Sequence, residues 1–452
     1  MTYTQKIAAF CHDVSVHGIP ERVEEKAKAC IADAFHALLL ALPSETSILL
    51  SQYLSQSAGV GQSSMAGRGL ADPESAALYN ASLAAVHEID DVHYDTSLHP
   101  GAVIVPAALS ACESVNASPK RLMAAVAVGY EVAVRLSVAA GYRHYHFFHS
   151  ATTCGTVGAA AAASVALNLP AHQIQNALGL AVTSASGLWE GITDQAVMVK
   201  HLHLGQAAER GIRSARLAAL GWPAAPQALE GPRGFLAALA QPGEHAPGEA
   251  PSPAELERIL TDGLGKTWAI ERNIFKRVPF CLGVSEPLEG LRELLRQHPG
   301  RKQEIAEIIV ESSHSVAWLV GNSHPQDECQ ARFSAPYALS LLLAGLNPET
   351  VPLPIQWLTH PDVEKWLPKI KMVGRSDIGS RKALVTVVFQ NGERFTADQP
   401  LRNMTNQEAF ARLGGVARDY MGATGERLAE IVSALDQQQD LLELGTILRS
   451  GA

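Results

Sequence analysis

The stretch GTVGAAAAASVALNL, from Gly155 to Leu169, consists largely of glycine and alanine. Side chains this small let neighbouring helices approach one another closely, so the stretch predicts a helix against which other helices pack. The composition of the whole chain agrees, because alanine is abundant and aromatic residues make up only 6% of it. Both features favour tightly packed helices over sheet.

Helical periodicity continues on both sides of this stretch. Between residues 21 and 41, apolar side chains recur at helical spacing, and charged residues occupy the other face. Similar patterns predict helices over residues 75–87, 102–114, 120–138, 171–186 and 203–220. The most apolar segment, LMAAVAVGYEVAVRLSVAAG from Leu122, is interrupted by Glu131 and Arg135. We therefore expect a buried core helix there rather than a membrane span.

The pattern changes at QPGEHAPGEAPSP, residues 241–253, whose four prolines predict a loop or a domain edge. Strand signals follow at 304–314, 369–374 and 383–398. In the last of these, two β-rich runs flank Asn391-Gly392, which favours a two-residue hairpin turn. The tail from 406 to 449 returns to a helical pattern.

These patterns predict a mainly α protein with two domains, which is also the default for a chain of 452 residues. We expect almost the whole of the first part, to about residue 260, to be helical. A large all-helical domain is predicted over residues 1–265 and 401–452, and a smaller α+β domain over residues 270–400.

Charge and cysteine content exclude several classes of protein. A net charge of −9 lacks the basic excess of a general nucleic-acid binder, so no nucleic-acid partner is expected. None of the six cysteines forms a CxxC pair, and the start MTYTQKIAAFCHDV lacks the pattern of a signal peptide. We expect a cytoplasmic protein with reduced thiols and no membrane association.

The segment AVHEIDDVHYDTSLHPGAV, residues 85–103, carries the densest cluster of chemical groups. Four carboxylates and three imidazoles fall within 13 residues, and burying them is costly unless they are paired or used. They are Glu88, Asp90, Asp91, Asp95, His87, His93 and His99. General acid–base chemistry is one interpretation, and a solvated acidic loop that caps the next helix is the alternative.

Two metal-dependent interpretations of this segment have weaker support. Asp90, Asp91 and Asp95 resemble the aspartate-rich motif of a terpene synthase, but no second metal-binding box follows and aromatic residues are scarce. Metal binding by His87 and His93 lacks an HExxH or comparable ligand spacing. We therefore expect no metal.

Four further segments carry candidate groups. HYHFFHSATTCGTVG, from His144, places a hydroxyl-rich turn before a helix whose N-terminus suits a carboxylate, whereas Cys154 is expected to be a packed thiol. VKHLHLGQAAERG, from Val199, has a Lys-x-x-His arrangement that suits an anion or belongs to a surface cluster. IFKRVPFCLG, from Ile274, holds a basic pair at a proline turn, which fits a substrate clamp. Tyr337 lies at the start of a predicted helix in ARFSAPYALSLLL. A single tyrosine in such a position usually packs in the core and has no chemical role.

Taken together, these segments resemble the MmgE/PrpD family, which includes 2-methylcitrate dehydratase, cis-aconitate decarboxylase and iminodisuccinate epimerase. The blocks follow the family's order and cover most of the chain. They are DDVHYDTSLHPGAVIVPAAL (90–109), HSATTCGTVGAAAAAS (149–164), VKHLHLGQAAERG (199–211), ALEGPRGF (228–235), FKRVP (275–279) and RFSAPYAL (332–339).

The resemblance implies an active site in the cleft between the two domains, a homodimer, and no required metal or organic cofactor. The family's active-site positions map onto Asp91, His99, His149, Lys200, Lys276 and Tyr337. Groups that would bind the substrate are His93, Thr153, His203 and Arg277. The first block departs from the Asp-Phe-Asp-Asp-Thr common in the family, because this chain has Glu88-Ile89-Asp90-Asp91-Val92.

The resemblance further implies a small polycarboxylate substrate. The expected activity is a cofactor-independent lyase that dehydrates or decarboxylates a compound like 2-methylcitrate or cis-aconitate, by abstracting a proton next to a carboxylate. An epimerase or racemase of an imino- or amino-dicarboxylate, such as iminodisuccinate, is the alternative. A dimeric binding protein without activity is a third class, and the lysines and histidines at the matching positions argue against it.

Overall fold

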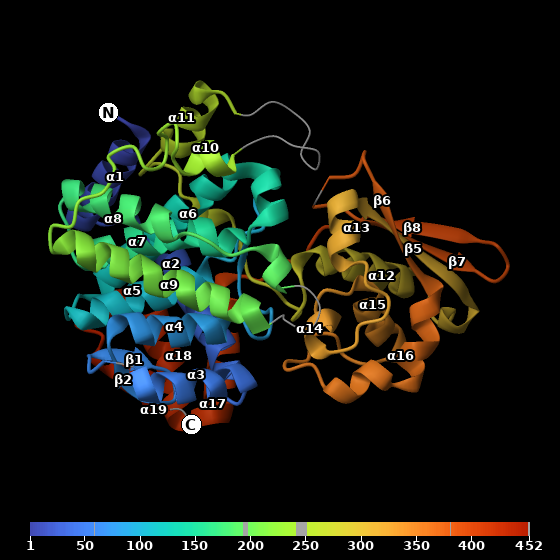
Figure 1. Cartoon of the computed structure of the whole chain (residues 1–452). Helices are drawn as coiled ribbons and strands as arrows, with labels where there is room; N and C mark the ends of the chain where they lie inside the picture. The colour runs from blue at the N-terminus through green and yellow to red at the C-terminus, as the bar shows by residue number, and fades with distance from the viewer. Residues whose placement is uncertain (58, 193–197, 241–250, 380, 451–452) are drawn as a thin grey trace. The chain divides into compact units, whose positions relative to one another are not determined.

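The structure, a computed structural model, describes residues 1–57, 59–192, 198–240, 251–379 and 381–450. The chain divides into two compact units (Figure 1). The helical unit comprises Met1–Val86, Asp90–Phe275 and Thr405–Ala452, and the sheet unit comprises His87–Ile89 and Lys276–Met404. Most of the proline-rich segment at 241–253, predicted as a loop or domain edge, lies outside the described residues.

The prediction of a mainly helical protein, with a helical domain and a smaller domain that contains a sheet, is confirmed. The helices of the helical unit are α1 (Tyr3–His17), α2 (Glu21–Leu40), α3 (Glu45–Ser57), α4 (Pro73–Ala84), α5 (Gly101–Ser114), α6 (Pro119–Phe147), α7 (Ser150–Ala166), α8 (Ala171–Ser184), α9 (Met198–Ala219), α10 (Phe235–Leu239), α11 (Pro253–Thr261), α17 (Asn406–Met421), α18 (Ala423–Ser433) and α19 (Leu442–Ser450).

Local sequence explains where several of these helices begin. The Ser118 hydroxyl accepts the backbone N–H of Arg121 at 3.3 Å and so caps the start of α6, with proline at the first helical position. Thr405 and Glu408 form a reciprocal capping box at the start of α17. Such caps satisfy backbone N–H groups that the first helical turn leaves unpaired.

Helix α7 is buried along its whole length and packs against α6 and α9 (Figure 1). Its small residues allow this approach: Gly158 faces Gly129 and Ala133 of α6. Within α6, the segment Pro119–Gly141 is long and apolar enough to cross a membrane, but 89% of its most apolar window is buried inside the protein. The expected buried core helix is therefore confirmed.

The helical unit also contains two short antiparallel ladders, which the helical periodicity did not predict. In one, β1 (Ser63–Met65) pairs with β2 (Gly69–Ala71). In the other, β3 (Val92–His93) pairs with β4 (Asn273–Ile274), joining segments far apart in the chain. Ladders this short have no detectable alternation in the sequence, and the pairing of β3 with β4 also depends on a long-range contact.

The sheet unit contains a four-stranded mixed sheet in the order β6-β5-β7-β8. Its strands are β5 (Ile305–Ser313), β6 (Ile370–Arg375), β7 (Leu384–Phe389) and β8 (Arg394–Ala397). Its helices are α12 (Ser285–Gln297), α13 (His314–Val320), α14 (Glu328–Ala331), α15 (Ala335–Ala344) and α16 (Pro361–Trp366). The β5–β6 pair is parallel, and the chain between these strands carries α13 to α16.

The hairpin between β7 and β8 forms at the predicted Asn391-Gly392, but the prediction of a two-residue turn is wrong. The Phe389 N–H donates to the carbonyl of Glu393 at 2.9 Å, so three residues lie in the loop. Gly392 has φ of 88°, the left-handed conformation that closes a three-residue hairpin loop. The dipeptide therefore located the turn correctly but not its length.

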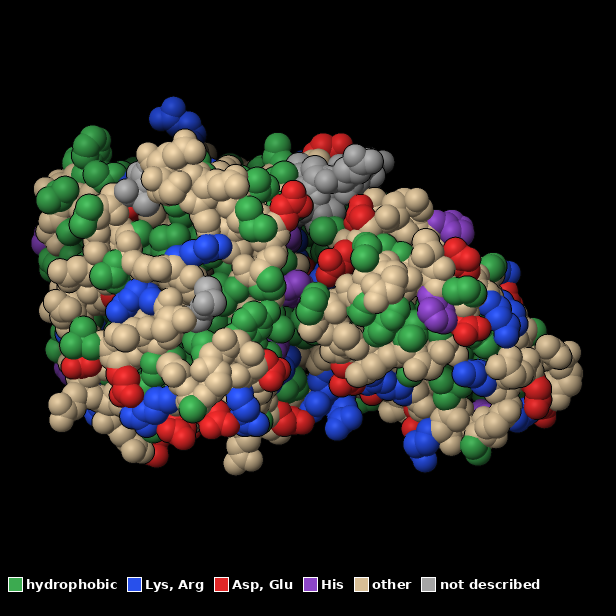
Figure 2. Space-filling model, turned by 90° about the horizontal axis from the view of Figure 1, so that it is seen from below, with side chains coloured by type: hydrophobic (Ala, Val, Ile, Leu, Met, Phe, Trp, Pro, Cys, Tyr) green, Lys and Arg blue, Asp and Glu red, His purple; other side chains and the backbone are tan. Residues whose placement is uncertain are grey.

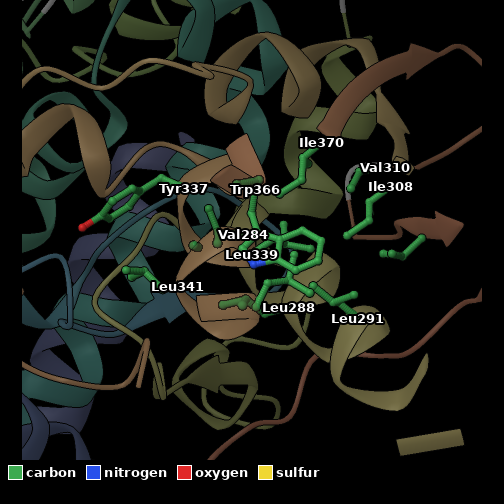
Figure 3. Packing of buried hydrophobic residues seen from close by; sticks show 14 of the residues in the cluster. Val284, Leu288, Leu291, Ile308, Val310, Tyr337, Leu339, Leu341, Trp366 and Ile370 are labelled. Atoms are coloured by element: carbon green, nitrogen blue, oxygen red, sulfur yellow. The ribbon is translucent and has the colours of Figure 1, made fainter. Parts of the chain in front are cut away.

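The core of the sheet unit lies between the sheet and its helices (Figure 3). Leu288 and Leu291 of α12 pack with Ile308 of β5 and with Trp366 of α16. Tyr337 of α15 stands at the edge of this cluster, with its hydroxyl directed away from the aliphatic side chains (Figure 3). The ring of Tyr337 therefore packs in the hydrophobic core, while its hydroxyl lies outside the aliphatic cluster.

Acidic and basic side chains are interspersed on the face of the protein drawn in Figure 2. On the described part of that face, charge of one sign does not gather into a broad stripe. Several charged side chains of the predicted site, among them Asp91, Lys200 and Lys276, are instead buried.

Candidate active site

The densest chemical segment, which leads from the end of α4 through β3 into α5, holds a carboxylate–imidazole pair. Nδ1 of His99 lies 3.0 Å from Oδ2 of Asp90. Both groups are buried, with Asp90 1% and His99 7% exposed. A carboxylate at this position holds the ring in the tautomer whose proton is on Nδ1, so that Nε2 carries a lone pair. This pair has the geometry of a positioned general base.

The adjacent Asp91 is fully buried and accepts three hydrogen bonds. Its donors are the backbone N–H of Gly101 at 2.8 Å, the hydroxyl of Tyr130 at 2.5 Å and the side-chain amide of Asn273 at 2.5 Å. Burial, together with the negative charge of Asp33, raises the pKa of the Asp91 carboxyl, and the donors act in the opposite direction.

Two other groups of this segment are tied to the protein itself. Nε2 of His93 lies 3.0 Å from the carbonyl of Ala269, and its Nδ1 accepts the backbone N–H of Asp95 at 3.3 Å. The Asp95 carboxylate forms an exposed bidentate pair with Arg272 at 2.5 and 2.6 Å. This arrangement favours a structural role for Asp95, and the predicted substrate contact of His93 stays a prediction.

The start of α7 brings together a second group of predicted residues. His149, 1% exposed, is the N-cap residue of α7, and its backbone N–H donates to the carbonyl of Gly187 at 2.9 Å. Its ring centroid lies 5.1 Å from that of Trp189 and 6.0 Å from that of His203. Burial and the charge of Arg210 lower the pKa of His203, which favours a neutral imidazole.

Lys200 lies one turn before His203 on α9 and is only 3% exposed. An ammonium group at this depth is stable only near compensating polar or negative groups, so its burial marks a polar region inside the helical unit. In the predicted Lys-x-x-His arrangement the lysine is therefore buried, while His203 is half-buried.

Thr153, predicted to contact the substrate, is bonded to a histidine that the site prediction did not include. Its hydroxyl lies 2.8 Å from Nε2 of His144. Burial lowers the pKa of His144 to about 4, so the ring is neutral at neutral pH. His144 also stacks on Phe148, with ring centroids 5.5 Å apart.

The sheet unit contains the other lysine of the prediction. Lys276 is fully buried, and its Nζ lies 3.5 Å from Oε1 of Glu88 and 3.5 Å from the carbonyl of Phe280. Glu88 itself has φ of 52°, a left-handed conformation that is uncommon for a residue with a side chain. Glu88 is the residue that replaces the family's first aspartate, so the departure noted in the sequence falls on the partner of Lys276.

The neighbouring His87 is held by Arg332, which is 3% exposed. The guanidinium donates to the carbonyl of His87, lies 2.9 Å from its Nδ1, and pairs with Glu328. His87 to Ile89 thus belong to the sheet unit, although Val86 and Asp90 on either side belong to the helical unit.

Tyr337 and Arg277 complete the predicted set. The Tyr337 backbone N–H donates to the Ser334 hydroxyl at 3.0 Å in the first turn of α15. Burial, with a smaller contribution from the charge of Glu328, raises the pKa of the Tyr337 hydroxyl to about 12. Arg277 is half-buried next to Lys276. The predicted cleft between the domains, which would bring the two sets of residues together, stays a prediction.

Several contributing residues were not among the predicted site residues. Asp90 and Glu88 lay inside the acidic segment, so the density of charge was a signal for both. His144 lay inside the second candidate segment, whereas Tyr130, Asn273 and Trp189 gave no comparable signal, because each meets its partner only through the fold. Among the described residues, no group of three or more His, Cys, Asp or Glu side chains is arranged to hold a metal ion.

Comparison with known protein families identifies the family to which the chain belongs. The MmgE/PrpD N-terminal domain matches residues 5–247, and the MmgE/PrpD C-terminal domain matches residues 278–435. The chain therefore belongs to the MmgE/PrpD family, as the sequence blocks predicted.

Curated relatives include two cis-aconitate decarboxylases. The chain is 28% identical to the one from Homo sapiens, an alignment that covers 99% of this chain and 94% of that protein. It is 26% identical to the one from Aspergillus terreus (strain NIH 2624 / FGSC A1156), over 75% of this chain and 71% of that protein. A cis-aconitate decarboxylase-like protein from Aspergillus oryzae is 30% identical over 51% of this chain and 48% of its own length.

Proposed function

We propose that this protein is a lyase that abstracts a proton next to a carboxylate of a di- or tricarboxylate, without a metal or organic cofactor. The observation that carries the proposal is the buried Asp90–His99 pair, 3.0 Å between Oδ2 and Nδ1. Because Asp90 engages Nδ1, Nε2 is the nitrogen that takes up the proton. The substrate class follows from the relatives named cis-aconitate decarboxylase, since cis-aconitate is a tricarboxylate.

A substrate with two or three negative charges needs cations in its pocket. Lys200 and Lys276, which are 3% and 0% exposed, are our candidates, assisted by Arg277. His203, whose lowered pKa favours the neutral ring, is a proposed hydrogen-bond partner of the substrate rather than a cation. Negative charge builds on a carboxylate as the adjacent proton leaves, and a fixed cation aimed at it stabilises the enediolate-like transition state. Each such contact contributes about 3 kcal/mol in a dry site.

A second group must deliver a proton, and Tyr337 and His149 are the candidates. With its pKa raised to about 12, Tyr337 remains protonated at neutral pH and is therefore a donor. In a dehydratase the base takes the proton and this group protonates the leaving hydroxyl. In a decarboxylase the electron pair comes from the C–C bond that breaks as CO₂ departs, no proton is abstracted, and this group protonates the resulting carbanion. In an epimerase it returns a proton to the opposite face. His93 and Thr153 remain proposed substrate contacts, and a homodimer in the cytoplasm remains a prediction.

The test is to incubate the purified protein in D₂O with 2-methylcitrate, citrate, cis-aconitate and iminodisuccinate, and to follow each compound by NMR. Loss of water or CO₂ from one of them supports the lyase. Deuterium that enters without loss of either group supports the epimerase instead. An absence of reaction and exchange across the whole panel contradicts the enzymatic proposal, and activity that survives EDTA excludes a Mg²⁺-dependent terpene synthase.

The role of the pair is tested by Asp90→Asn and His99→Gln. His99→Gln removes the proposed base and Asp90→Asn removes the carboxylate that orients it, so we expect each to lower kcat by about 100-fold or more while the protein remains folded by circular dichroism. Asp95→Asn is the matched control, because Asp95 lies in the same segment but pairs with Arg272 at the surface. Near-normal turnover of His99→Gln contradicts the assigned role.

A further inference from the structure

The three hydrogen bonds to Asp91 come from three separate elements. Oδ1 accepts the Gly101 N–H at the start of α5, and Oδ2 accepts both the Tyr130 hydroxyl of α6 and the Asn273 amide of β4. Asp91 is 0% exposed, so both oxygens are occupied by the protein and shielded from solvent. A carboxylate used in this way is a structural centre rather than a group that faces a ligand.

Asn273 extends these contacts further into the helical unit. Its backbone carbonyl accepts Nζ of Lys26, from α2, at 2.9 Å, and the same ammonium lies 3.8 Å from the centroid of the Phe275 ring. Asn273 also pairs with His93 in the β3–β4 ladder. The network therefore links β3, β4 and the start of α5 to positions within α2 and α6.

We call Asp91 and its three donors, Gly101, Tyr130 and Asn273, the Asp91 network. Along the chain, this network lies next to His99, the proposed base. Asp90 and Asp91 are adjacent, and Gly101 follows two residues after His99. Two neighbouring side-chain contacts therefore join the two ends of the loop between Asp91 and His99. One link is Asp90–His99 and the other is Asp91–Gly101. Gly101 is required at this point, because a Cβ there would lie 2.7 Å from both Asp91 oxygens and from the Tyr130 hydroxyl.

We propose that Asp91, together with Tyr130 and Asn273, is a positioning group that sets the place of His99, and that Asp91 does not touch the substrate. This inference rests on the proposed function of His99 as the base. Misplacement of a catalytic group by about 1 Å lowers the rate by up to about 100-fold, so a network that fixes both ends of the loop has a direct effect on turnover.

The groups that face Asp91 are consistent with this role. The carboxylates of Asp33 and Asp90 add negative charge, and Tyr130, Asn273 and Gly101 supply the donors that oppose it. Removal of one donor weakens the hold of the network on Asp91 and leaves the Asp91 carboxylate in place. The informative change is therefore one that deletes a donor without changing the shape of the core.

Tyr130→Phe is that change, because it keeps the buried ring and deletes the hydroxyl. We expect kcat to fall by about 10-fold, while KM changes less than two-fold. Tyr79→Phe is the matched control: Tyr79 is equally buried, and its hydroxyl lies 2.8 Å from the Ser47 hydroxyl and accepts Nε of Arg68 at 3.4 Å. It is expected to lose similar thermal stability and to keep the kcat of the unchanged protein.

Amide hydrogen exchange gives a second readout that needs no substrate. Exchange in the peptide that covers residues 92–101 is expected to accelerate in Tyr130→Phe and to stay unchanged in Tyr79→Phe. If exchange accelerates but the unchanged protein turns over none of the polycarboxylates, the positioning network stands and the proposed function fails. Unchanged exchange and unchanged kcat in Tyr130→Phe overturn the inference. If kcat and exchange are unchanged but KM rises by about 10-fold or more, the inference is overturned in favour of direct substrate contact by Asp91.

Discussion

At the level of single residues, burial determines the charge that an imidazole carries. His144 is 2% exposed, and its polar contacts are the neutral hydroxyls of Thr153 and Ser150. No opposite charge compensates the loss of water in these contacts, so the charged form is disfavoured and the pKa falls to about 4. Nδ1 of His99, in contrast, lies 3.0 Å from the Asp90 carboxylate.

The lowered pKa of His144 predicts a loss of stability at mildly acid pH. In the unfolded chain the ring takes up a proton near its ordinary pKa of 6.5, whereas in the folded protein it stays neutral down to about 4. The unfolded state thus binds more protons in this window. The contribution to the free energy of unfolding is fully present above pH 6.5 and is lost as the pH falls towards 4, by about 3 kcal/mol in total.

Urea unfolding at pH 7 and pH 5 measures this effect. The unchanged protein is expected to lose about 2 kcal/mol more than His144→Gln between the two values. His17→Gln is the control, since His17 is exposed at the end of α1, and its loss should match that of the unchanged protein. An equal loss in His144→Gln and the unchanged protein contradicts the assignment.

At the level of elements, the packing of α7 depends on where its glycines lie. A Cβ at Gly158 would be 2.6 Å from Cβ of Ala133 and 2.7 Å from the carbonyl of Gly129, both on α6. A Cβ at Gly155 would be no closer than 3.5 Å to Val103 of α5, which is an ordinary contact. The two glycines are three residues apart on one helix, yet only one of them is required by the approach of a neighbour.

Gly158→Ala and Gly155→Ala should therefore differ in stability. Alanine favours a helix over glycine by about 1 kcal/mol, so Gly155→Ala is expected to be neutral or stabilising. In Gly158→Ala the overpacking against α6 outweighs this gain, and we expect a net loss of about 2 kcal/mol. Thermal unfolding of the two variants measures the difference, and equal melting temperatures would show that α6 and α7 are free to separate.

At the level of the whole molecule, the C-terminal helices complete the helical unit. Arg412 of α17 pairs with the buried Asp33 of α2, and Lys28 of α2 pairs with Asp436 at 2.7 Å. The carbonyl of Leu448 accepts the backbone N–H of Gly67 at 2.9 Å. The chain thus leaves the helical unit to build the sheet unit and returns to finish the core it began.

Arg412→Ala is expected to destabilise the helical unit strongly. The Asp33 carboxylate is 1% exposed, so it loses a cation at a site with little solvent to replace it, at a cost of about 3 kcal/mol. Arg427→Ala removes an arginine that pairs with Glu443 at the surface, and it should cost less than about 1 kcal/mol. Chemical unfolding of both variants compares them, and similar losses would refute a special role for the buried pair.

The helices and the class of fold follow from the sequence itself. The spacing of apolar residues in α2, α6 and α8 is local, and so are the caps of α6 and α17, because each depends on residues within one or two helical turns. The hairpin at Asn391-Gly392 was also located by a local signal, although its length depended on how Phe389 and Glu393 pair. The density of carboxylates and imidazoles marked the chemical segment for the same reason.

The sequence by itself therefore determined the helical layer, the sheet that follows it and the segment in which the candidate groups are concentrated. Only the tertiary structure decided which of those groups are paired, and with what. Tyr130 and Asn273 lie 39 and 182 residues from Asp91, and Lys276 lies 188 residues from Glu88. Burial and pairing over such separations are properties of the packed chain, because local spacing contains no information about which distant side chain fills the space next to a buried charge.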